Sequence, residues 1–207
     1  VNYDFDGKYL FEVNARYDGS SRFAKGNRYG FFPSVSAGWR VSNEKFWGTL
    51  SNVVNELKLR GSWGQVGSQT VGLYTYMPTY NLSNYIFNEA LATGYRQTSL
   101  TSTDLSWETT SQFDLGLDAS LFKGMLNFTA DYYKKTTRDI LLAVPIPTII
   151  GLSPTNQNAG VVENWGIEFL LGARKSFGKV DLDLSFNMNY NKNTVIDLAG
   201  AGPFISA

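Results

Sequence analysis

The stretch VDLDLSFNMNYN, residues 180–191, alternates between apolar and polar side chains at every position. Its even-numbered residues are apolar and its odd-numbered residues are polar. Period-two alternation predicts a β-strand with two different faces. In a soluble sheet the apolar face packs on a core. In a membrane barrel that face contacts lipid, while the polar face lines a wet lumen. This strand alone is compatible with both arrangements.

Six further segments share the alternating pattern. They are residues 8–18, 29–42, 56–65, 108–121, 125–135 and 161–174. Strands of soluble proteins usually have about 5–6 residues, whereas a strand that crosses a membrane needs about 9–11. Because most of the seven segments are this long, their length favours membrane spans over strands of a soluble domain.

The connections between the segments differ in length in a regular way. Long links at 19–28, 66–107 and 136–160 alternate with tight links at 122–124 and 175–179. A third link of the second kind, residues 43–55, is expected to form a short helical turn. Long loops at one end and short turns at the other are typical of outer-membrane barrels.

Aromatic side chains gather near the predicted strand ends, where Trp and Tyr favour a membrane–water interface. They are Tyr9, Tyr17, Trp39, Phe46, Trp47, Trp63, Trp107, Trp165 and Tyr190. The apolar faces carry almost no charge. Lipid enforces such a pattern, because a Lys or Arg facing mid-membrane costs about 2–4 kcal/mol. Glu163 is the exception and is therefore expected near an interface.

Composition removes several function classes. The 207 residues carry 18 basic and 18 acidic side chains, with no Cys and no His. A balanced charge argues against nucleic-acid binding. The missing residue types exclude disulfides, thiolate metal sites and a Ser-His-Asp triad. Asp181 and Asp183 share a polar face, as any wet strand produces. We therefore predict no catalytic residue, no cofactor site and no metal site. Neither a signal peptide nor a transmembrane helix is visible.

Several motifs carry a family resemblance, and they occur in a fixed order. They are ARYDGSSRFAKGNRYGFFPSVSAGWRVSNEKFW (15–47), LKLRGSWGQVG (57–67), LSWETTSQFDLGLDASLF (105–122), LNFTADYYKKTTRDILL (126–142) and NAGVVENWGIEFLL (158–171). Together they span most of the chain. In these motifs the sequence resembles the SusC/RagA family of TonB-dependent outer-membrane transporters of Bacteroidetes-type bacteria.

The resemblance implies a barrel of about 22 strands closed around a plug. It also implies TonB-driven import of glycan or peptide oligomers, with a SusD-like surface lipoprotein as a lid. No plug or N-terminal domain is visible, and seven strands is an odd number, whereas single-chain bacterial barrels are even. We therefore expect residues 1–207 to form an all-β antiparallel meander, a part of the β-barrel domain embedded in outer-membrane lipid.

The segment 66–107 is the best candidate for ligand contact. Its predicted contact residues are Tyr74, Tyr76, Tyr80, Tyr85, Asn81 and Asn84. Aromatic faces stack on sugars or peptides, and amides supply both donors and acceptors. The alternative is that these rings pack the loop against itself or against neighbouring loops.

Two other loops are candidates for contact with a partner protein or with lipid. The apolar stretch 140–150, with Pro145 and Pro147, either contacts the lipoprotein lid or tucks into the barrel rim. Prolines exclude it from a central strand. The basic loop 18–28 is expected to be an extracellular turn, either solvated or in contact with lipopolysaccharide phosphates.

Two alternative functions remain open from the sequence. A passive outer-membrane porin has the same wall but no dependence on TonB. A soluble all-β binding or adhesin module has the same alternation but folds without detergent.

Overall fold

The computed structural model describes residues 1–198, and nearly all regular structure in them is β. The strands are β1 (Asn2–Phe5), β2 (Tyr9–Gly19), β3 (Tyr29–Arg40), β4 (Val54–Ser68), β5 (Tyr80–Phe87), β6 (Ala90–Gln97), β7 (Glu108–Leu121), β8 (Leu126–Ala143), β9 (Asn156–Phe177) and β10 (Val180–Asp197). Three short 3-10 helices are η1 (Val41–Asn43), η2 (Lys45–Asn52) and η3 (Thr148–Ile150). The first two form the helical turn expected between the second and third predicted strands.

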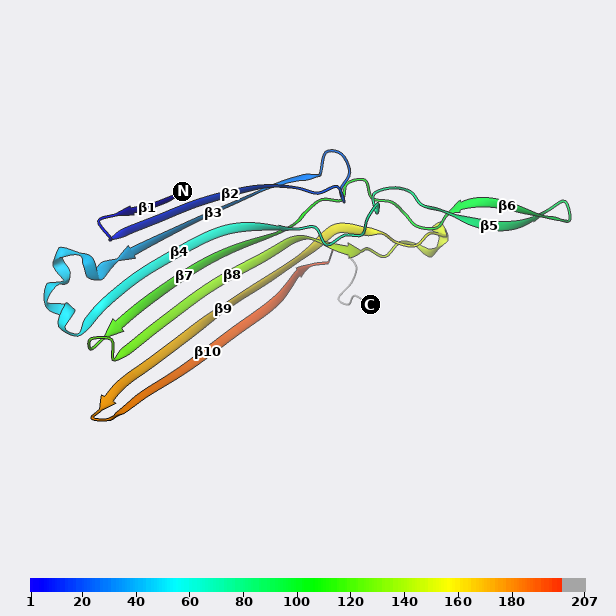
Figure 1. Ribbon diagram of the computed structural model, residues 1–207. Coiled ribbons are helices and arrows are strands. Elements are labelled where there is room, and N and C mark those ends of the chain that lie inside the picture. The colour runs from blue at the N-terminus through cyan, green and yellow to red at the C-terminus, as the bar shows by residue number, and fades with distance from the viewer. Residues whose placement is uncertain (199–207) are drawn as a thin grey trace.

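Eight strands form one open sheet in the order β1-β2-β3-β4-β7-β8-β9-β10 (Figure 1). Every neighbouring pair in it is antiparallel. The predicted antiparallel meander of about seven strands is confirmed. The seven predicted segments correspond to β2, β3, β4 and β7 to β10, and β1 adds an eighth strand to this sheet. The extra strand, β1, is joined to β2 by a turn in which Asp6 and Gly7 both have positive φ. An Asp-Gly pair of this kind supports a tight hairpin.

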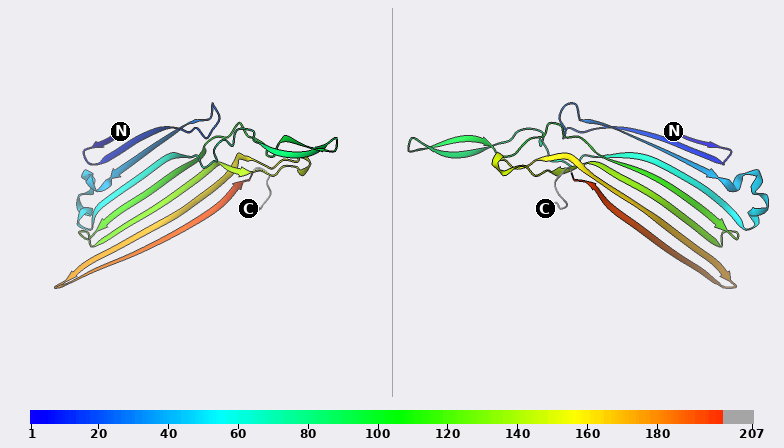
Figure 2. Two further views of the ribbon diagram at one scale, coloured as in Figure 1. Left: turned by 45° about the vertical axis from the view of Figure 1, so that its right-hand side comes forward. Right: turned by 180° about the vertical axis from the view of Figure 1, so that it is seen from behind.

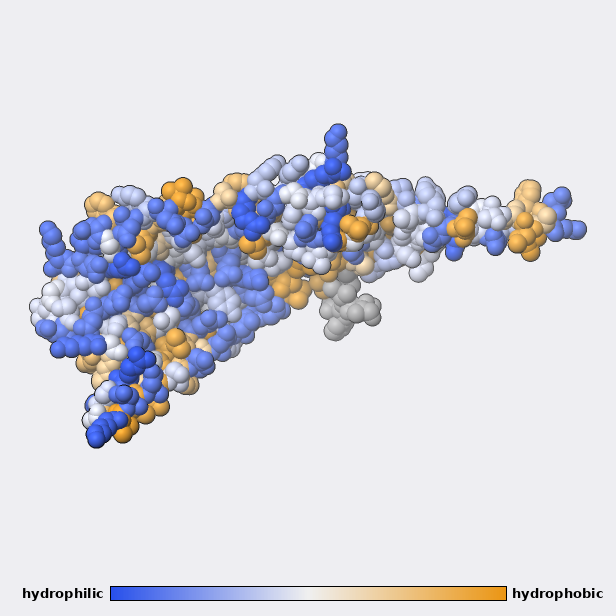
Figure 3. All heavy atoms as spheres, viewed as in Figure 1, coloured by the Kyte–Doolittle hydropathy of each residue, from blue (hydrophilic) through white to orange (hydrophobic). Residues whose placement is uncertain are grey.

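The register of the sheet places the predicted apolar sets on one face. Directly opposed residues of a ladder point to the same side. Val13, Val35, Trp63 and Phe113 oppose one another in sequence from β2 to β7. Further along the sheet, other apolar rows cross β8, β9 and β10 in the same way. The opposite face is polar, and hydrophilic residues dominate the middle of the sheet in Figure 3.

The apolar face of the sheet has no covering layer. Leu184 and Phe186 are 57% and 60% exposed, and similar values recur along β2, β3 and β10. A face of this size would be an aggregation hazard in water, whereas lipid tails cover it naturally. Among residues 1–198, none of the helices is long and apolar enough to span a membrane.

The two ends of the sheet differ as the loop lengths predicted. Tight turns and the η1–η2 segment lie at one end. The long loops lie at the other end, from which β5 and β6 project as a separate two-stranded hairpin (Figure 2). We call this hairpin, Tyr80–Phe87 with Ala90–Gln97, the arm. By the usual asymmetry of outer-membrane barrels, the end with the arm is the extracellular end.

Candidate functional site

The polar face of the sheet forms an inner wall with its own hydrogen-bond network. Arg60 on β4 donates through Nε to Asp118 Oδ2 at 3.1 Å and through Nη2 to Asp131 Oδ2 at 2.8 Å. Asp118 also accepts from Thr129 at 3.2 Å. Three neighbouring strands, β4, β7 and β8, are thereby tied together by side chains in addition to their backbone ladder.

Gly116 makes the Arg60 contact possible. Arg60, Gly116 and Asp131 oppose one another across β4, β7 and β8. A Cβ at position 116 would lie only 2.4 Å from Arg60 Cζ and 2.5 Å from Asp131 Oδ1. The guanidinium of Arg60 therefore occupies the space beside Gly116 that a side chain would fill, which explains the glycine at this strand position.

Two open hollows lie along the wall beside this network. One, of about 450 Å³, includes Lys58, Arg60 and Asp114 in its lining. The other, of about 490 Å³, includes Arg16, Gln112 and Lys135. Both signs of charge and several amides thus face one lumen, a surface suited to water and polar groups. No group of three or more metal-binding side chains occurs within residues 1–198.

The outer wall carries two levels of aromatic rings. Near the extracellular end, Tyr17 stacks on Tyr29 at 5.3 Å. On β8, β9 and β10 the Trp165 ring lies 6.4 Å from Tyr132 and 5.7 Å from Tyr190, on the extracellular side of the apolar residues that continue β9. Near the other end, Tyr9 stacks on Trp39 at 6.5 Å. Two aromatic levels with an apolar band between them are the girdles of a transmembrane barrel.

Glu44 anchors the lower level. Its carboxylate accepts from Tyr9 at 2.6 Å and from the Trp39 indole at 3.2 Å. The hydrogen bond from Tyr9, followed by that from Trp39, lowers the pKa of Glu44 below its ordinary value. The charge of Glu44 therefore fixes the polar edges of two rings whose bodies face the membrane.

The prediction that Glu163 is the exception in the apolar faces is wrong, because Lys134 in the fifth predicted segment opposes Trp165 and therefore projects from the same face. Glu163 lies at the upper level. It opposes Thr136 on β8 and Thr194 on β10 and pairs with Lys134 at 2.9 Å. Trp165, two residues away on the same face, supports a location of Glu163 near an interface, which stays a prediction.

A small buried cluster lies beneath the extracellular loops. Phe23 and Leu105 are fully buried, and they pack with Val71, Trp107 and Leu141. We call these five residues the collar. Four of them come from loops far apart in the chain, and Leu141 lies near the extracellular end of β8. The collar is a packed hydrophobic core at the point where loops 20–28 and 69–107 leave the wall.

Hydrogen bonds close the collar. Arg22 donates to the Val71 carbonyl at 2.5 Å, and the Trp107 indole donates to the Arg28 carbonyl at 3.2 Å. Asn158 accepts from the Ser106 amide at 2.8 Å and donates to the Ser106 carbonyl at 2.9 Å. The segments before and after the arm are therefore tied to the wall, whereas the arm is held by its own ladder and by side-chain hydrogen bonds such as that from Asn81 to Thr98.

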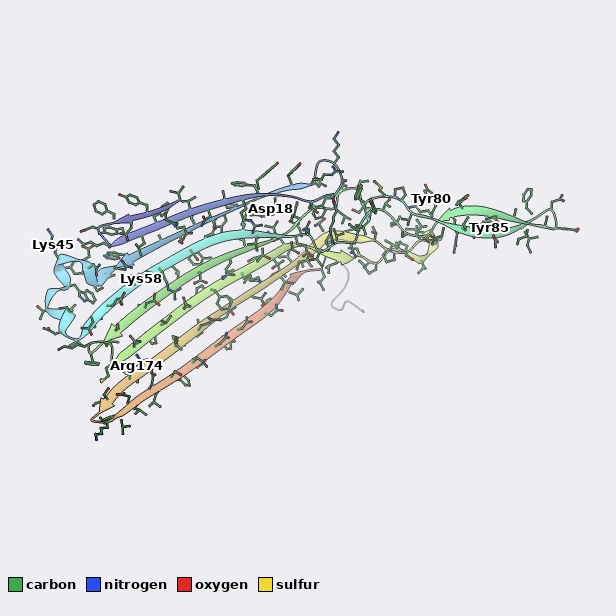
Figure 4. The ribbon with its side chains drawn as sticks, viewed as in Figure 1. Asp18, Lys45, Lys58, Tyr80, Tyr85 and Arg174 are labelled. Atoms are coloured by element: carbon green, nitrogen blue, oxygen red, sulfur yellow. The ribbon has the colours of Figure 1, made fainter. Side chains whose placement is uncertain are left out.

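The structure separates the predicted ligand residues. Tyr74 and Tyr76 lie in the turn before the arm, while Tyr80 and Tyr85 lie on it (Figure 4). By the alternation of the strand, Tyr80 and Asn84 share one face of the arm, whereas Asn81 and Tyr85 share the other. Asn81 donates to Thr98 at 3.3 Å, and Asn84 accepts from Thr93 at 3.1 Å. The six residues do not surround a single cavity, so the ligand role stays a prediction.

The sequence analysis did not anticipate the arm or the Arg60 network. Two sequence signals could have predicted the arm. They are the alternation in 80–87 and 90–97 and the Asn at the turn, where Asn88 and Glu89 have positive φ. The Arg60 contact has a weaker signal in the sequence, because predicting it requires the strand register that places Gly116 opposite Arg60 and Asp131.

Comparison with known proteins is decisive for the family. The family described as TonB dependent receptor-like, beta-barrel, matches residues 1–204. The chain belongs to this TonB-dependent receptor β-barrel family. Its wall is therefore the wall of an outer-membrane barrel, and the predicted resemblance to SusC/RagA transporters is confirmed. The soluble adhesin alternative is not supported.

Relatives of the TonB-dependent receptor family match nearly the whole chain. A TonB-dependent receptor of Formosa agariphila is 38% identical over 205 residues, which cover 99% of this chain and 19% of that receptor. The TonB-dependent receptor SusC of Bacteroides thetaiotaomicron is 36% identical over 206 residues, covering 97% of this chain and 20% of SusC. The chain thus spans about a fifth of the length of these relatives.

Solved structures agree with this assignment. The RagAB peptide importer in its open-open state matches with a TM-score of 0.85 at 33% identity, over 95% of this chain and 21% of that chain. Another structure of the RagAB peptide transporter matches with a TM-score of 0.83 over 97% of this chain and 22% of that chain. The open sheet described above therefore corresponds to a part of a larger transporter barrel.

Proposed function

We propose that this chain supplies wall strands to a TonB-dependent transporter that imports glycan or peptide oligomers across the outer membrane. The observation that carries the proposal is the division of the sheet. An uncovered apolar face meets lipid, and a charged, hydrogen-bonded face meets an aqueous lumen. Relatives described as TonB-dependent receptors and as a peptide importer support active uptake.

The proposed partners are a SusD-like surface lipoprotein acting as a lid and the TonB complex. The expectation that the stretch 140–150 is excluded from a central strand holds only after Ala143, because residues 140–143 belong to β8. The arm and the loop 144–155 project beyond the extracellular end of the sheet (Figure 1). The arm carries exposed apolar side chains at Leu82, Ile86 and Leu91, and Ile149 in the loop is 94% exposed. Exposed apolar groups of this kind are typical of protein contacts.

Substrate uptake by cells that make the full-length protein tests the proposal. Labelled oligosaccharides and labelled oligopeptides are supplied separately, with and without a protonophore. TonB-dependent import is expected to stop when the proton gradient collapses, because the inner-membrane energy source is then lost. A passive porin, the alternative, would continue to admit the substrate. Uptake that resists the protonophore would therefore reject the active mechanism.

A further inference from the structure

Two lysines flank Trp165 on the outer wall. Lys134 on β8 and Lys192 on β10 both stand directly opposite Trp165 on β9. All three side chains therefore project from the same face of the sheet. Neighbouring strands are about 4.8 Å apart, so the two lysine Cα atoms are separated by about 10 Å. Each ammonium ends a flexible four-carbon stem, and both can thus approach a single anion above the indole.

The position of the two lysines along the wall is set by the upper aromatic level. Trp165 contacts Tyr132 and Tyr190, and Ile167, Phe169 and Leu171 continue β9 toward the opposite end. Trp and Tyr mark the headgroup level of a membrane. The lysines therefore lie where lipid tails give way to headgroups, on the side of the wall that faces lipid.

The charge of this cluster is only partly balanced. Lys192 is exposed, and no residue of the described chain 1–198 pairs with it. Lys134 pairs with Glu163 at 2.9 Å. Thr136 and Thr194 oppose Glu163 on each side and add two hydroxyl groups. Two cations against one carboxylate leave a positive excess, which favours an anionic headgroup.

The basic loop 18–28 is a weaker candidate for the same role. Two of its three cations are engaged within the protein, since Arg22 donates to the Val71 carbonyl and Arg28 to the Phe23 carbonyl. Their donors are thus directed at the collar. This contrast favours the lysine pair on the outer wall over the basic loop.

The geometry points to a binding site for the phosphate of an outer-leaflet lipid, formed by Lys134 and Lys192 on either side of Trp165. The two ammonium groups share the phosphate, and the sugar or glycerol portion rests against Trp165 and Tyr190. The carboxylate of Glu163 repels the phosphate and competes with it for the ammonium group of Lys134. Removal of this one carboxylate is therefore expected to strengthen binding.

The test uses the full-length protein in detergent and a diphosphorylated glucosamine disaccharide lipid, with bound lipid counted by native mass spectrometry. The matched ligands are the dephosphorylated lipid with the same acyl chains and inorganic phosphate alone. We expect the double variant K134Q/K192Q to bind the phosphorylated lipid roughly tenfold more weakly. Glu163→Gln should bind it several-fold more tightly.

A control variant separates this site from general attraction to cations. Lys175 lies on the same strand near the opposite end, with its ammonium 5.1 Å from the Phe177 ring centre. Lys175→Gln removes one positive charge from β9 but should leave lipid binding unchanged. Resistance of the folded barrel to SDS confirms that each variant is folded.

Three results would overturn the site. The first is unchanged binding by folded K134Q/K192Q. The second is equal binding of the dephosphorylated lipid, which would show that acyl chains alone are recognised. The third is binding of inorganic phosphate at the same concentrations as the lipid, which would show an anion site without lipid specificity.

Discussion

Arg60 and Asp131 lie on strands that are not neighbours, and they meet over the single residue that separates them in the sheet, Gly116. The Nη2 atom of Arg60 is 2.8 Å from Asp131 Oδ2. Side chains on alternate strands normally stay apart because the side chain between them fills the gap. Here the gap is left open by glycine, and the guanidinium occupies it.

The first prediction follows from this close approach. Gly116→Ala should destabilise the barrel by about 1–3 kcal/mol, the usual cost of forcing a methyl group into a filled site. Equilibrium unfolding of the full-length protein in detergent measures the change. Gly172→Ala is the matched control, because its nearest contact outside its chain neighbours is the Asn127 carbonyl oxygen at 3.9 Å. Equal stability of the two variants would contradict the prediction.

The sheet was readable from the sequence because lipid and water act on each strand independently. Each of the seven alternating segments reports its own two faces, and register then aligns the faces. β1 was missed because four residues are too few for a periodic signal, although Asp6-Gly7 marked the turn. The Arg60 contact could not be predicted from the sequence, because its partners Asp118 and Asp131 are 58 and 71 residues away along the chain and are brought close only by strand pairing.

The candidate ligand site could be predicted only as a segment. Composition located the aromatic and amide residues in 66–107, but the face that each side chain occupies depends on where the arm begins. Tyr80 and Tyr85 are five positions apart on one strand, so they point to opposite sides. The collar could not be predicted from the sequence either, because most of its residues come from loops, which have no periodic pattern of apolar residues.

A second prediction concerns the collar. Leu105 is fully buried against Phe23 and Val71. Leu105→Ala should cost about 2–5 kcal/mol locally and loosen the base of the arm. Hydrogen exchange should therefore accelerate across residues 69–107 while β7 to β10 stay protected. Leu91→Ala, at an exposed position on the arm, removes the same atoms without leaving a cavity and should not change exchange at the base. Unchanged exchange in the Leu105 variant would mean that the collar does not hold the arm.

A third prediction uses the lowered pKa of Glu44. A carboxyl group whose pKa is lower in the folded state stabilises the fold above its ordinary pKa, near 4.5. That contribution is lost as the pH falls through the lower folded-state value. The native protein should therefore melt at a higher temperature than Glu44→Gln at neutral pH, and the difference should shrink in acid. Glu89→Gln at the arm tip controls for the loss of one carboxylate. A difference that is constant with pH would rule out the charge of Glu44 as its source.

A fourth prediction tests the orientation of the wall. The chain has no native cysteine, so single cysteines at Leu184 and Ser185 report their surroundings without background. In outer membranes, Ser185→Cys should react with a water-soluble maleimide, whereas Leu184→Cys should react only with a lipid-soluble one. Leu184 is 57% exposed in the isolated sheet, so only lipid shields it from the aqueous reagent. Resistance of Leu184→Cys to both reagents would indicate a protein layer in place of lipid.

The last prediction concerns the two faces of the arm. If the aromatic residues bind the substrate, the arm presents it with either Tyr80 and Asn84 or Asn81 and Tyr85, because the two pairs point to opposite sides of the hairpin. One double variant, Y80A/N84A or N81A/Y85A, should therefore weaken substrate affinity about five- to tenfold, as expected for loss of one stacked ring. The other should bind as the native protein does. Affinity is measured by calorimetry on the full-length transporter with the oligomer that it imports. If the combined variant Tyr76→Ala, Tyr80→Ala and Tyr85→Ala keeps native affinity, the rings serve the arm's own packing or a protein contact, and the ligand site lies elsewhere.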